Sequence, residues 1–148
     1  MRIEVFAIAR NESKILPYFI RHYRQFAEII IIENNSTDNT VKIAQAMGAR
    51  VWKCNIPDER SNIWFLSVKN NVWKTSKADW VIVCDADEFV YHPDIIDILE
   101  NTKATIIQPL FFEMFSEKFP TTKGQIYDEI KTGVIGKNKM NIFRPSEI

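Results

Sequence analysis

The chain has 148 residues, which suits one domain with a hydrophobic core. Hydrophobic residues make up 46% and charged residues 26%, and the 4 glycines and 6 prolines are too few for a linker-rich or disordered chain. The 19 basic and 19 acidic residues cancel, so the charge gives no support for a nucleic-acid-binding surface.

The chain begins with an apolar run over residues 3–9, which predicts a strand ending at the polar cluster Arg10–Ser13. A helix follows, with Pro17 in its first turn, where a missing N–H costs little. Its apolar stripe has helical spacing: Ile15, Phe19, Tyr23 and Phe26. Four consecutive isoleucines, Ile29–Ile32, then predict a strand buried on both faces, as in a parallel sheet covered by helices.

The segment Glu33–Asp38 is dense in turn and capping residues. We expect Asn35, Ser36 and Asp38 to cap the next helix, over Val41–Met47, which Gly48 ends. A short strand over Val51–Lys53 and a helix from about Ser61 to Thr75 come next.

The second half opens with an all-apolar strand, Trp80–Cys84, which ends on the acidic run Asp85–Phe89. Pro93 is expected to open a short helix through Leu99. Residues 105–112 predict a further strand, in which Pro109 indicates an edge or a bulge. Ile142–Phe143 predict a last short strand.

Alternating strands and helices predict an α/β fold, a single domain with a mostly parallel sheet flanked by helices. In such folds, ligands bind beyond the carboxyl ends of the strands. Three polar clusters fall at such ends: Arg10–Ser13, Glu33–Asp38 and Asp85–Glu88. If these strands are neighbours the clusters converge, and the functional site is expected there.

Asp85 and Asp87 would point the same way from an extended segment, because side chains alternate along a strand. Two carboxylates facing one spot repel each other unless a cation lies between them, and Mg²⁺ or Mn²⁺ prefers such oxygen ligands. A metal there would neutralise a diphosphate leaving group. The alternative is a pair of solvated turn residues, since a bare D-x-D pattern is common. Glu88 points elsewhere in an extended segment, as a surface or supporting group.

Two other acidic motifs fit poorly. An EF-hand loop counted from Asp85 needs Gly and Glu where Val90 and Ile96 stand. A phosphatase of the haloacid dehalogenase type carries its D-x-D pair after the first strand and a second acidic pair downstream, and this chain has neither.

Taken together, three pieces of sequence resemble the glycosyltransferase family 2 superfamily, in its branch with an R-N-E opening. The pieces are Ala9-Arg10-Asn11-Glu12, then Ile32–Thr40, then Lys69-Asn70 followed by Asp79-Trp80-Val81 and Asp85-Ala86-Asp87-Glu88-Phe89. His22 stands where that branch commonly has a histidine. The resemblance covers roughly residues 3–90.

This resemblance implies a GT-A fold and a metal-dependent enzyme that moves a sugar from a nucleotide diphosphate donor to a hydroxyl of a glycan, lipid-linked or other acceptor. UDP is the expected nucleotide, by family frequency, and Mn²⁺ or Mg²⁺ the expected cofactor. The metal ligands implied are Asp85 and Asp87. Glu33 keeps the charge of the family's base-binding aspartate and lengthens its reach. The nucleotide-binding residues implied are Ala9, Arg10, Asn11, Glu33, Lys69, Asn70 and Asp85.

Simpler roles stay open for several of these residues. Asn11 and Glu12 could cap the first helix, and His22 on an apolar helix is more often packed than a ligand. The four tryptophans are expected in the core rather than as sugar-stacking platforms: Trp52, Trp64, Trp73 and Trp80.

Residues 1–90 are expected to form the nucleotide-binding half, and residues 91–148 a shortened acceptor or lid half, with features of a mobile lid over Thr121–Lys139. The catalytic base is not identified. The candidates are Glu113, Asp128 and Glu129, together with Glu117, and the sequence does not choose among them. His92 is close in sequence to the acidic pair, but it precedes Pro93 and could simply face solvent. A nucleotide-sugar-binding module without turnover, working with a partner chain, is therefore the second hypothesis.

The thiols Cys54 and Cys84 fit neither a zinc spacing nor a disulfide framework, and Cys84 should pack as a small buried hydrophobe. We therefore expect a cytoplasmic protein. The first apolar run is too short and interrupted for a signal peptide, and no run approaches the roughly 20 residues that span a bilayer. Peripheral association with the cytoplasmic face of a membrane stays open.

Overall fold

A computed structural model describes residues 1–54, 62–137 and 141–148. Within these residues, six strands form one sheet in the order β3-β2-β1-β4-β8-β5. β1 pairs in parallel with β2 and β4, and β2 with β3, whereas β8 is antiparallel to β4 and β5. The strands are β1 (Ile3–Ala9), β2 (Glu28–Glu33), β3 (Arg50–Lys53), β4 (Trp80–Asp85), β5 (Ile106–Ile107) and β8 (Asn141–Phe143). The predicted mostly parallel α/β fold is confirmed.

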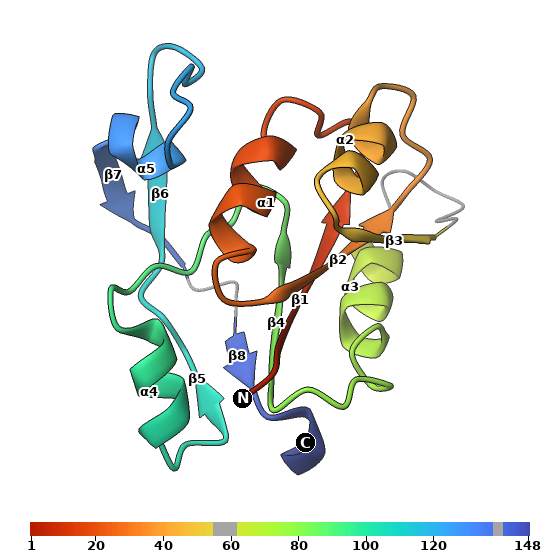
Figure 1. The fold of residues 1–148 in the computed structure, drawn as a ribbon, viewed down its shortest axis with the longest axis vertical. Coiled ribbons are helices and arrows are strands. Elements are labelled where there is room, and N and C mark those ends of the chain that lie inside the picture. Colours follow the sequence, from red (N-terminus) through yellow and green to blue (C-terminus); the bar gives the residue numbers. More distant parts are fainter. Residues whose placement is uncertain (55–61, 138–140) are drawn as a thin grey trace.

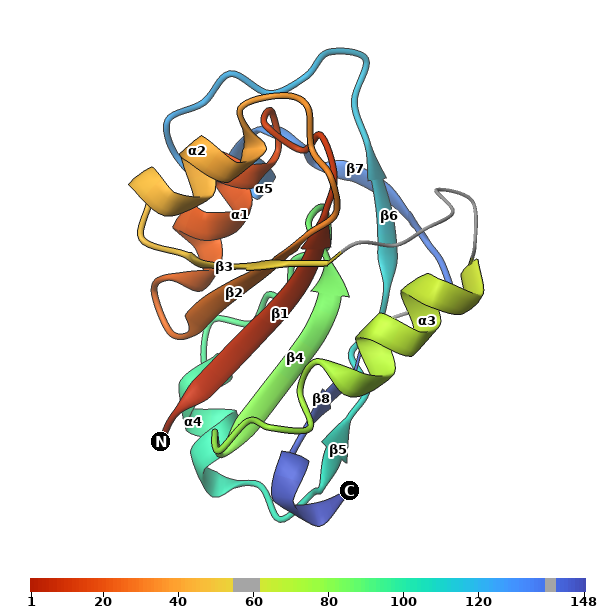
Figure 2. The same ribbon diagram turned by 90° about the vertical axis from the view of Figure 1, so that its right-hand side faces the viewer.

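Helices cover both faces of this sheet, with α1, α2 and α4 on one side and α3 on the other (Figures 1 and 2). Their bounds are α1 (Leu16–Tyr23), α2 (Thr40–Ala46), α3 (Asn62–Asn71) and α4 (Ile95–Asn101). Pro17 lies in the first turn of α1, as predicted. Gly48 follows α2 with a φ of 84°, the left-handed conformation that a glycine supplies without steric cost.

The core has two layers because side chains of a strand alternate between the two faces of the sheet. Ile29 and Ile31 pack with α1 on one face, and Ile30 and Ile32 pack with α3 on the other. All four are buried. A strand with both faces covered cannot alternate apolar with polar residues, which is why the isoleucine run identified it.

The structure corrects the strand expected over Thr105–Phe112. Its first part is β5, and its last residue begins β6 (Phe112–Phe115), which pairs with β7 (Thr132–Ile135) in a separate two-stranded sheet. Pro109 lies between the two strands, and β5 is an edge strand, as the proline indicated. Helix α3 ends at Asn71 rather than Thr75, and Ser61 lies outside the described residues.

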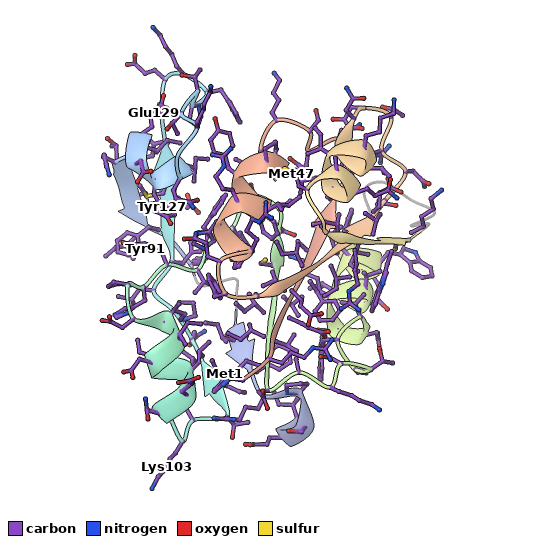
Figure 3. The ribbon with its side chains drawn as sticks, in the orientation of Figure 1. Met1, Met47, Tyr91, Lys103, Tyr127 and Glu129 are labelled. Atoms are coloured by element: carbon purple, nitrogen blue, oxygen red, sulfur yellow. The ribbon has the colours of Figure 1, made fainter. Side chains whose placement is uncertain are left out.

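The second sheet belongs to an arm that also holds the short helix α5 (Ile126–Glu129) and lies beside α1 (Figure 1). The Tyr18 hydroxyl donates to the carbonyl of Pro120 over 2.8 Å, and the Arg21 guanidinium donates to that of Gly124. The ring of Tyr127 lies 4.7 Å from that of Tyr91 (Figure 3). Part of the predicted lid, residues 121–129, is thus attached to α1, and its residues 138 and 139 lie outside the described part.

Both cysteines are free thiols, and Cys84 is fully buried, as expected. None of the helices in the described residues is long and apolar enough to cross a lipid bilayer. The chain closes with the 3₁₀ helix η1 (Pro145–Glu147).

Candidate nucleotide and metal site

The three polar clusters meet at one edge of the sheet. β1 lies between β2 and β4, and Ala9 is the register partner of Glu33 while Ile8 is that of Asp85. Parallel strands end at the same edge, so the loops after β1, β2 and β4 leave the sheet side by side. The expected convergence is confirmed, and Figure 2 shows β1 and β4 ending together.

Hydrogen bonds tie the loop after β1 to the loop after β2. Asn11 accepts from the backbone N–H of Thr37 at 2.8 Å and donates its own N–H to the Ser36 hydroxyl at 3.1 Å. Glu12 N–H donates to the Thr40 hydroxyl at 2.8 Å. Asn11 and Asn35 have φ values of 56° and 53°, in the left-handed region that asparagine tolerates better than most residues. The sequence indicated capping here, and the structure adds a brace between two loops.

Asp38 is the most heavily used side chain of this brace. Its carboxylate accepts from the N–H of Ser13 at 3.2 Å, the N–H of Thr40 at 2.9 Å and the Thr40 hydroxyl at 2.5 Å. Partial desolvation opposes the effect, but these hydrogen bonds hold the pKa of Asp38 well below its ordinary range. Asn39 is the N-cap residue of α2 and makes no side-chain cap bond. Asp38 instead accepts the N–H of Thr40, the first residue of α2, and so stabilises the start of the helix.

The acidic pair is open to solvent and lies beside a lysine. Asp87 is exposed, and the Asp85 side chain is 47% exposed. The Lys69 ammonium, reaching from α3, lies 2.6 Å from a carboxylate oxygen of Asp85. Desolvation raises the pKa of Glu12, and the charges of Asp87, Asp38 and Asp85 add to the rise. The carboxylates that follow β1 and β4 are therefore close enough to repel one another.

The pair does not sit on an extended segment, which corrects the alternation argument. Ala86 and Asp87 form a turn, closed by the N–H of Glu88 donating to the carbonyl of Asp85 at 3.1 Å. The Glu88 carboxylate accepts the N–H of Asp85 at 2.9 Å. Glu88 is buried, so it is not a surface group but a support for the turn, and burial raises its pKa.

Two side chains of α1 support this turn from behind. The fully buried Tyr23 hydroxyl donates to the carbonyl of Glu88 at 3.0 Å and accepts the N–H of Val90 at 2.9 Å. The Nε2 atom of His22 lies 2.7 Å from the carbonyl of Val90, and its Nδ1 atom 3.3 Å from the hydroxyl of Tyr127. Burial lowers the pKa of His22. His22 is thus packed, as its residue type suggested.

The acidic turn suits a metal that takes only part of its ligands from protein. Among the described residues, no group of three or more histidine, cysteine, aspartate or glutamate side chains is arranged to hold a metal ion. Mg²⁺ commonly uses one or two carboxylates and completes its shell with water and substrate phosphates. Asp85 and Asp87 are the candidates for such a pair in this turn, and the Lys69 ammonium lies against Asp85.

The other nucleotide-site residues are placed as follows. Ala9 is buried, Arg10 is half-buried at the sheet edge, and Asn70 is exposed on α3. Glu33 is buried, and its carboxylate accepts the N–H of Ser36 in its own loop. Its predicted contact with a base stays a prediction.

The candidate bases lie on the arm, on β6 and α5, and two of them hold backbone groups (Figure 3 labels Glu129). Asp128 accepts the N–H of Gln125 at 2.8 Å, and Glu129 accepts those of Thr121 and Thr122 at 3.1 and 3.0 Å. Glu113 is exposed on β6. No catalytic base is assigned by these positions.

The remaining candidates have ordinary surroundings. Glu117 is exposed beyond β6, and exposed His92 accepts the N–H of Asp94 at 3.0 Å through Nδ1.

Two tryptophans are not where their residue type suggested. Trp80 is fully buried and Trp73 is half-buried, as expected. Trp52 is 38% exposed and Trp64 is 49% exposed, so the core prediction is wrong for both. Trp52 lies on the edge strand β3, which has a neighbour on one side only.

Comparison with known proteins decides the family. A family model described as glycosyl transferase family 2 matches residues 4–146. The chain belongs to glycosyl transferase family 2. This membership leaves the phosphatase interpretation without support.

Relatives of this family 2 chain are longer proteins. It is 27% identical over 128 residues to a TPR repeat-containing protein of Synechococcus elongatus, covering 84% of this chain and 29% of that protein. It is 32% identical over 92 residues to an uncharacterized glycosyltransferase of Rickettsia prowazekii, covering 59% and 28%. The chain thus spans less than a third of the length of these curated relatives.

The fold also matches solved structures. Glucosyl-3-phosphoglycerate synthase from Mycobacterium tuberculosis, in complex with Mn²⁺, UDP and glucosyl-3-phosphoglycerate, aligns with a TM-score of 0.51 and 21% identity. The alignment covers 72% of this chain and 43% of that one. At this identity the likeness supports the GT-A fold.

The sequence did not reveal the support behind the acidic turn. Tyr23 belongs to an apolar stripe at helical spacing and looked like a core residue, and its hydroxyl meets partners 65 and 67 residues away. Its phenol was the available signal, because a buried tyrosine hydroxyl usually finds a hydrogen-bond partner.

Proposed function

We propose that this chain is the donor-binding domain of a glycosyltransferase that moves a sugar from a nucleoside diphosphate sugar to an acceptor hydroxyl. The observation that carries the proposal is the meeting of three loops at the carboxyl edge of β2, β1 and β4, where Asp85 and Asp87 reach solvent and the half-buried Lys69 pairs with Asp85. Membership of family 2 supports the reaction class. The Mn²⁺ and UDP of the mycobacterial synthase support the choice of a metal and of UDP.

In this proposal Asp87 and Asp85 hold the divalent metal and Lys69 contacts the diphosphate. When bound, the metal supplies positive charge that stabilises the departing diphosphate. Lys69 adds a second positive charge, and it can move from Asp85 to a phosphate oxygen because both are anionic acceptors. The brace around Asn11 and Asp38 keeps the nucleotide side of the site in one conformation before the donor arrives.

A donor-binding module without turnover is the second candidate, and a specific observation favours it. Asp128 and Glu129 are committed to backbone N–H groups of the arm, and acceptor activation needs a group that can take a proton from a hydroxyl. Release of free sugar or glycosylated acceptor from a UDP-sugar, followed by chromatography, separates the two candidates. Turnover supports the enzyme, and binding without turnover supports the module.

The test of the shared site is a thermal-shift screen of nucleoside diphosphates and their sugars, with and without Mn²⁺. A ligand at a hundred times its Kd stabilises the folded state by about 2.7 kcal/mol, which is easily seen. We expect metal-dependent stabilisation of the wild type and its loss in Asp87→Asn. Asp94→Asn is the matched control, since Asp94 is also exposed and makes no side-chain cap bond. Equal responses of wild type and Asp87→Asn would overturn the proposal.

A further inference from the structure

A groove runs along β3, the strand at one edge of the sheet. A hollow of about 460 Å³ lies between β3 and α3 and follows the helix from Trp64 to Thr75. A second hollow, of about 210 Å³, extends towards the beginning of the strand at Arg50. Trp52 and Thr75 line both hollows, so the two form one groove on the α3 side of β3, the strand that Figure 1 shows at the outer edge of the sheet.

The larger hollow exposes two aromatic side chains. Trp52 is 38% exposed on its strand wall, and Trp64 is 49% exposed on its helix wall. Val68 and Val72 add apolar surface from the direction of α3. A concave surface with large exposed apolar side chains is characteristic of a binding site. The groove therefore suits a ligand that inserts an apolar side chain between the two tryptophans.

The backbone of β3 is oriented for further strand pairing. Among the described strands, only β2 is its neighbour. The N–H of Cys54, just after β3, donates inward to the carbonyl of Glu33 at 2.7 Å. Because backbone groups alternate in direction along a strand, Val51 and Lys53 direct their N–H and C=O groups outward. An extended peptide can be recognised by adding to such an edge, while pockets beside it accept alternate side chains.

A strand added to β3 would place alternate side chains in the groove. Trp52 points to the α3 side of the sheet, because its register partner Ile32 packs on that side and its ring lies 5.7 Å from that of Phe6. Side chains at paired positions of adjacent strands share a face. Every second side chain of the added strand would therefore lie beside Trp52 and face Trp64.

Lysines surround the groove. Lys53 lines the larger hollow and Lys77 the smaller one. Lys74, which donates to the side chain of Asn71 at 2.9 Å, lies just beyond α3. All three lysines are exposed, and within the part of the chain that the structure describes none of them forms an ion pair.

The other charges at this edge cancel. Arg2 and Arg50 share Glu4 and Glu28 as ion-pair partners, over distances of 2.7 to 3.6 Å. The lysines therefore leave a surplus of positive charge, which an acidic partner complements. The same charges oppose pairing with a second copy of the chain, because two antiparallel β3 strands would bring Arg50 of each copy opposite Lys53 of the other.

We propose that the groove beside β3 binds an extended acidic segment of a partner protein, which adds to the sheet as a further strand. An apolar side chain of the segment enters the hollow between Trp52 and Trp64, and its acidic side chains meet Lys53 and Lys77. This site recognises a protein partner, so it is independent of the donor site at the acidic turn.

Selection from a phage-displayed library of random short peptides supplies the probe for a test. The wild-type chain is the target, and Trp64→Ala is used for counter-selection. We expect the enriched peptides to be acidic, to carry large apolar residues at alternate positions and to lack proline in their centre. A selection that enriches no peptide, or enriches basic peptides, overturns the proposal.

Fluorescence anisotropy of an enriched synthetic peptide then measures the contribution of single side chains. Trp64→Ala should weaken binding by about tenfold or more, because buried aromatic anchors dominate the binding free energy of an interface. Lys77→Glu should weaken it by about threefold at low salt and by less at high salt. Ile63→Ala is the matched control, because Ile63 is 79% exposed on the same helix and does not line the groove. Equal affinities of Trp64→Ala and wild type overturn the proposal, and the exposed Lys77 decides it if Trp64→Ala does not fold.

Amide hydrogen exchange tests whether the peptide pairs as a strand. The outward N–H groups of Val51 and Lys53 should exchange more slowly in the complex. The N–H of Cys54 should change little, because it is already bonded to Glu33. Of two peptides that carry N-methyl groups on alternate amides, one in each register, only one should bind. Equal binding of the two methylated peptides contradicts strand pairing.

Two further outcomes separate this inference from its alternatives. Asp87→Asn should bind the peptide like the wild type, so failure of the donor-site proposal leaves this one standing, and the reverse also holds. Self-association of the wild type in analytical ultracentrifugation, abolished by Trp64→Ala, would show that a second copy covers the groove and would overturn the proposal.

Discussion

Replacing Tyr23 by phenylalanine tests the support behind the acidic turn. The change keeps the ring and removes only the hydroxyl, which donates to the carbonyl of Glu88 and accepts the N–H of Val90. Both backbone groups belong to buried residues. Each buried group left without a partner costs about 1–3 kcal/mol, so Tyr23→Phe should lower the free energy of unfolding by about 2–4 kcal/mol. For a domain of this size the melting temperature should fall by about 5–12 °C.

Urea unfolding followed by far-UV circular dichroism measures the loss. Tyr18→Phe is the control, since Tyr18 is also buried and its hydroxyl makes one hydrogen bond, to the carbonyl of Pro120. The control should lose no more than about half as much. If Tyr23→Phe costs less than about 0.5 kcal/mol, the hydroxyl does not hold the segment that follows the acidic turn, and the reasoning fails.

Three further variants probe the charges around the site. Asp38→Asn should lower the free energy of unfolding at pH 7 by only about 1 kcal/mol, because the carboxylate that loses its charge is exposed to solvent. The pKa of Asp38 is depressed in the folded state, so the difference from wild type in urea unfolding should shrink as the pH falls below about 4. The free energy of unfolding of His22→Gln should lie closest to that of the wild type at pH 5 and fall further below it at pH 7. Burial lowers the pKa of His22 in the folded state, so protonation at low pH destabilises the wild type. A difference in urea unfolding that does not change with pH contradicts this. Lys69→Met should change the free energy of unfolding by less than about 1 kcal/mol, because its partner Asp85 is half exposed. The same variant should weaken UDP binding in calorimetry. Unchanged UDP binding would show that Lys69 does not contact the nucleotide.

The strands of the sheet could be predicted closely from local sequence. The isoleucine run gave β2 and the run Trp80–Cys84 gave β4, each within one residue of its observed ends. Such runs are informative because a strand covered on both faces is apolar at every position. The strand expected over Thr105–Phe112 divides between two sheets instead. The two parts separate because β5 pairs with β8 and β6 pairs with β7. These partner strands lie far along the chain, so the sequence of residues 105–112 alone does not indicate them.

Part of the candidate site could likewise be predicted from the sequence, and part of it could not. Polar clusters at strand ends identified the edge where Asp85 and Asp87 lie, since the carboxyl edge of a parallel sheet is a general property of the fold. The burial of Trp52 and Trp64 was predicted from residue type. The prediction fails for Trp52 because its strand, β3, lies at the edge of the sheet, which depends on strand order. It also fails for Trp64, which lies on α3 and is 49% exposed. A supporting role was one of the two left open for Glu88, but its hydrogen bond to the N–H of Asp85 could not be predicted, because an extended segment was assumed where the chain turns at Ala86.

The central claim is that the acidic turn at the end of β4 binds a divalent cation together with a nucleotide diphosphate. Electron paramagnetic resonance of Mn²⁺ measures this directly, because the sharp signal of free Mn²⁺ decreases as the ion binds to protein. In the presence of UDP, adding wild-type protein should decrease the free-ion signal beyond what UDP alone produces, and Asp87→Asn should not. An equal decrease with both proteins, or none with the wild type, would contradict the account.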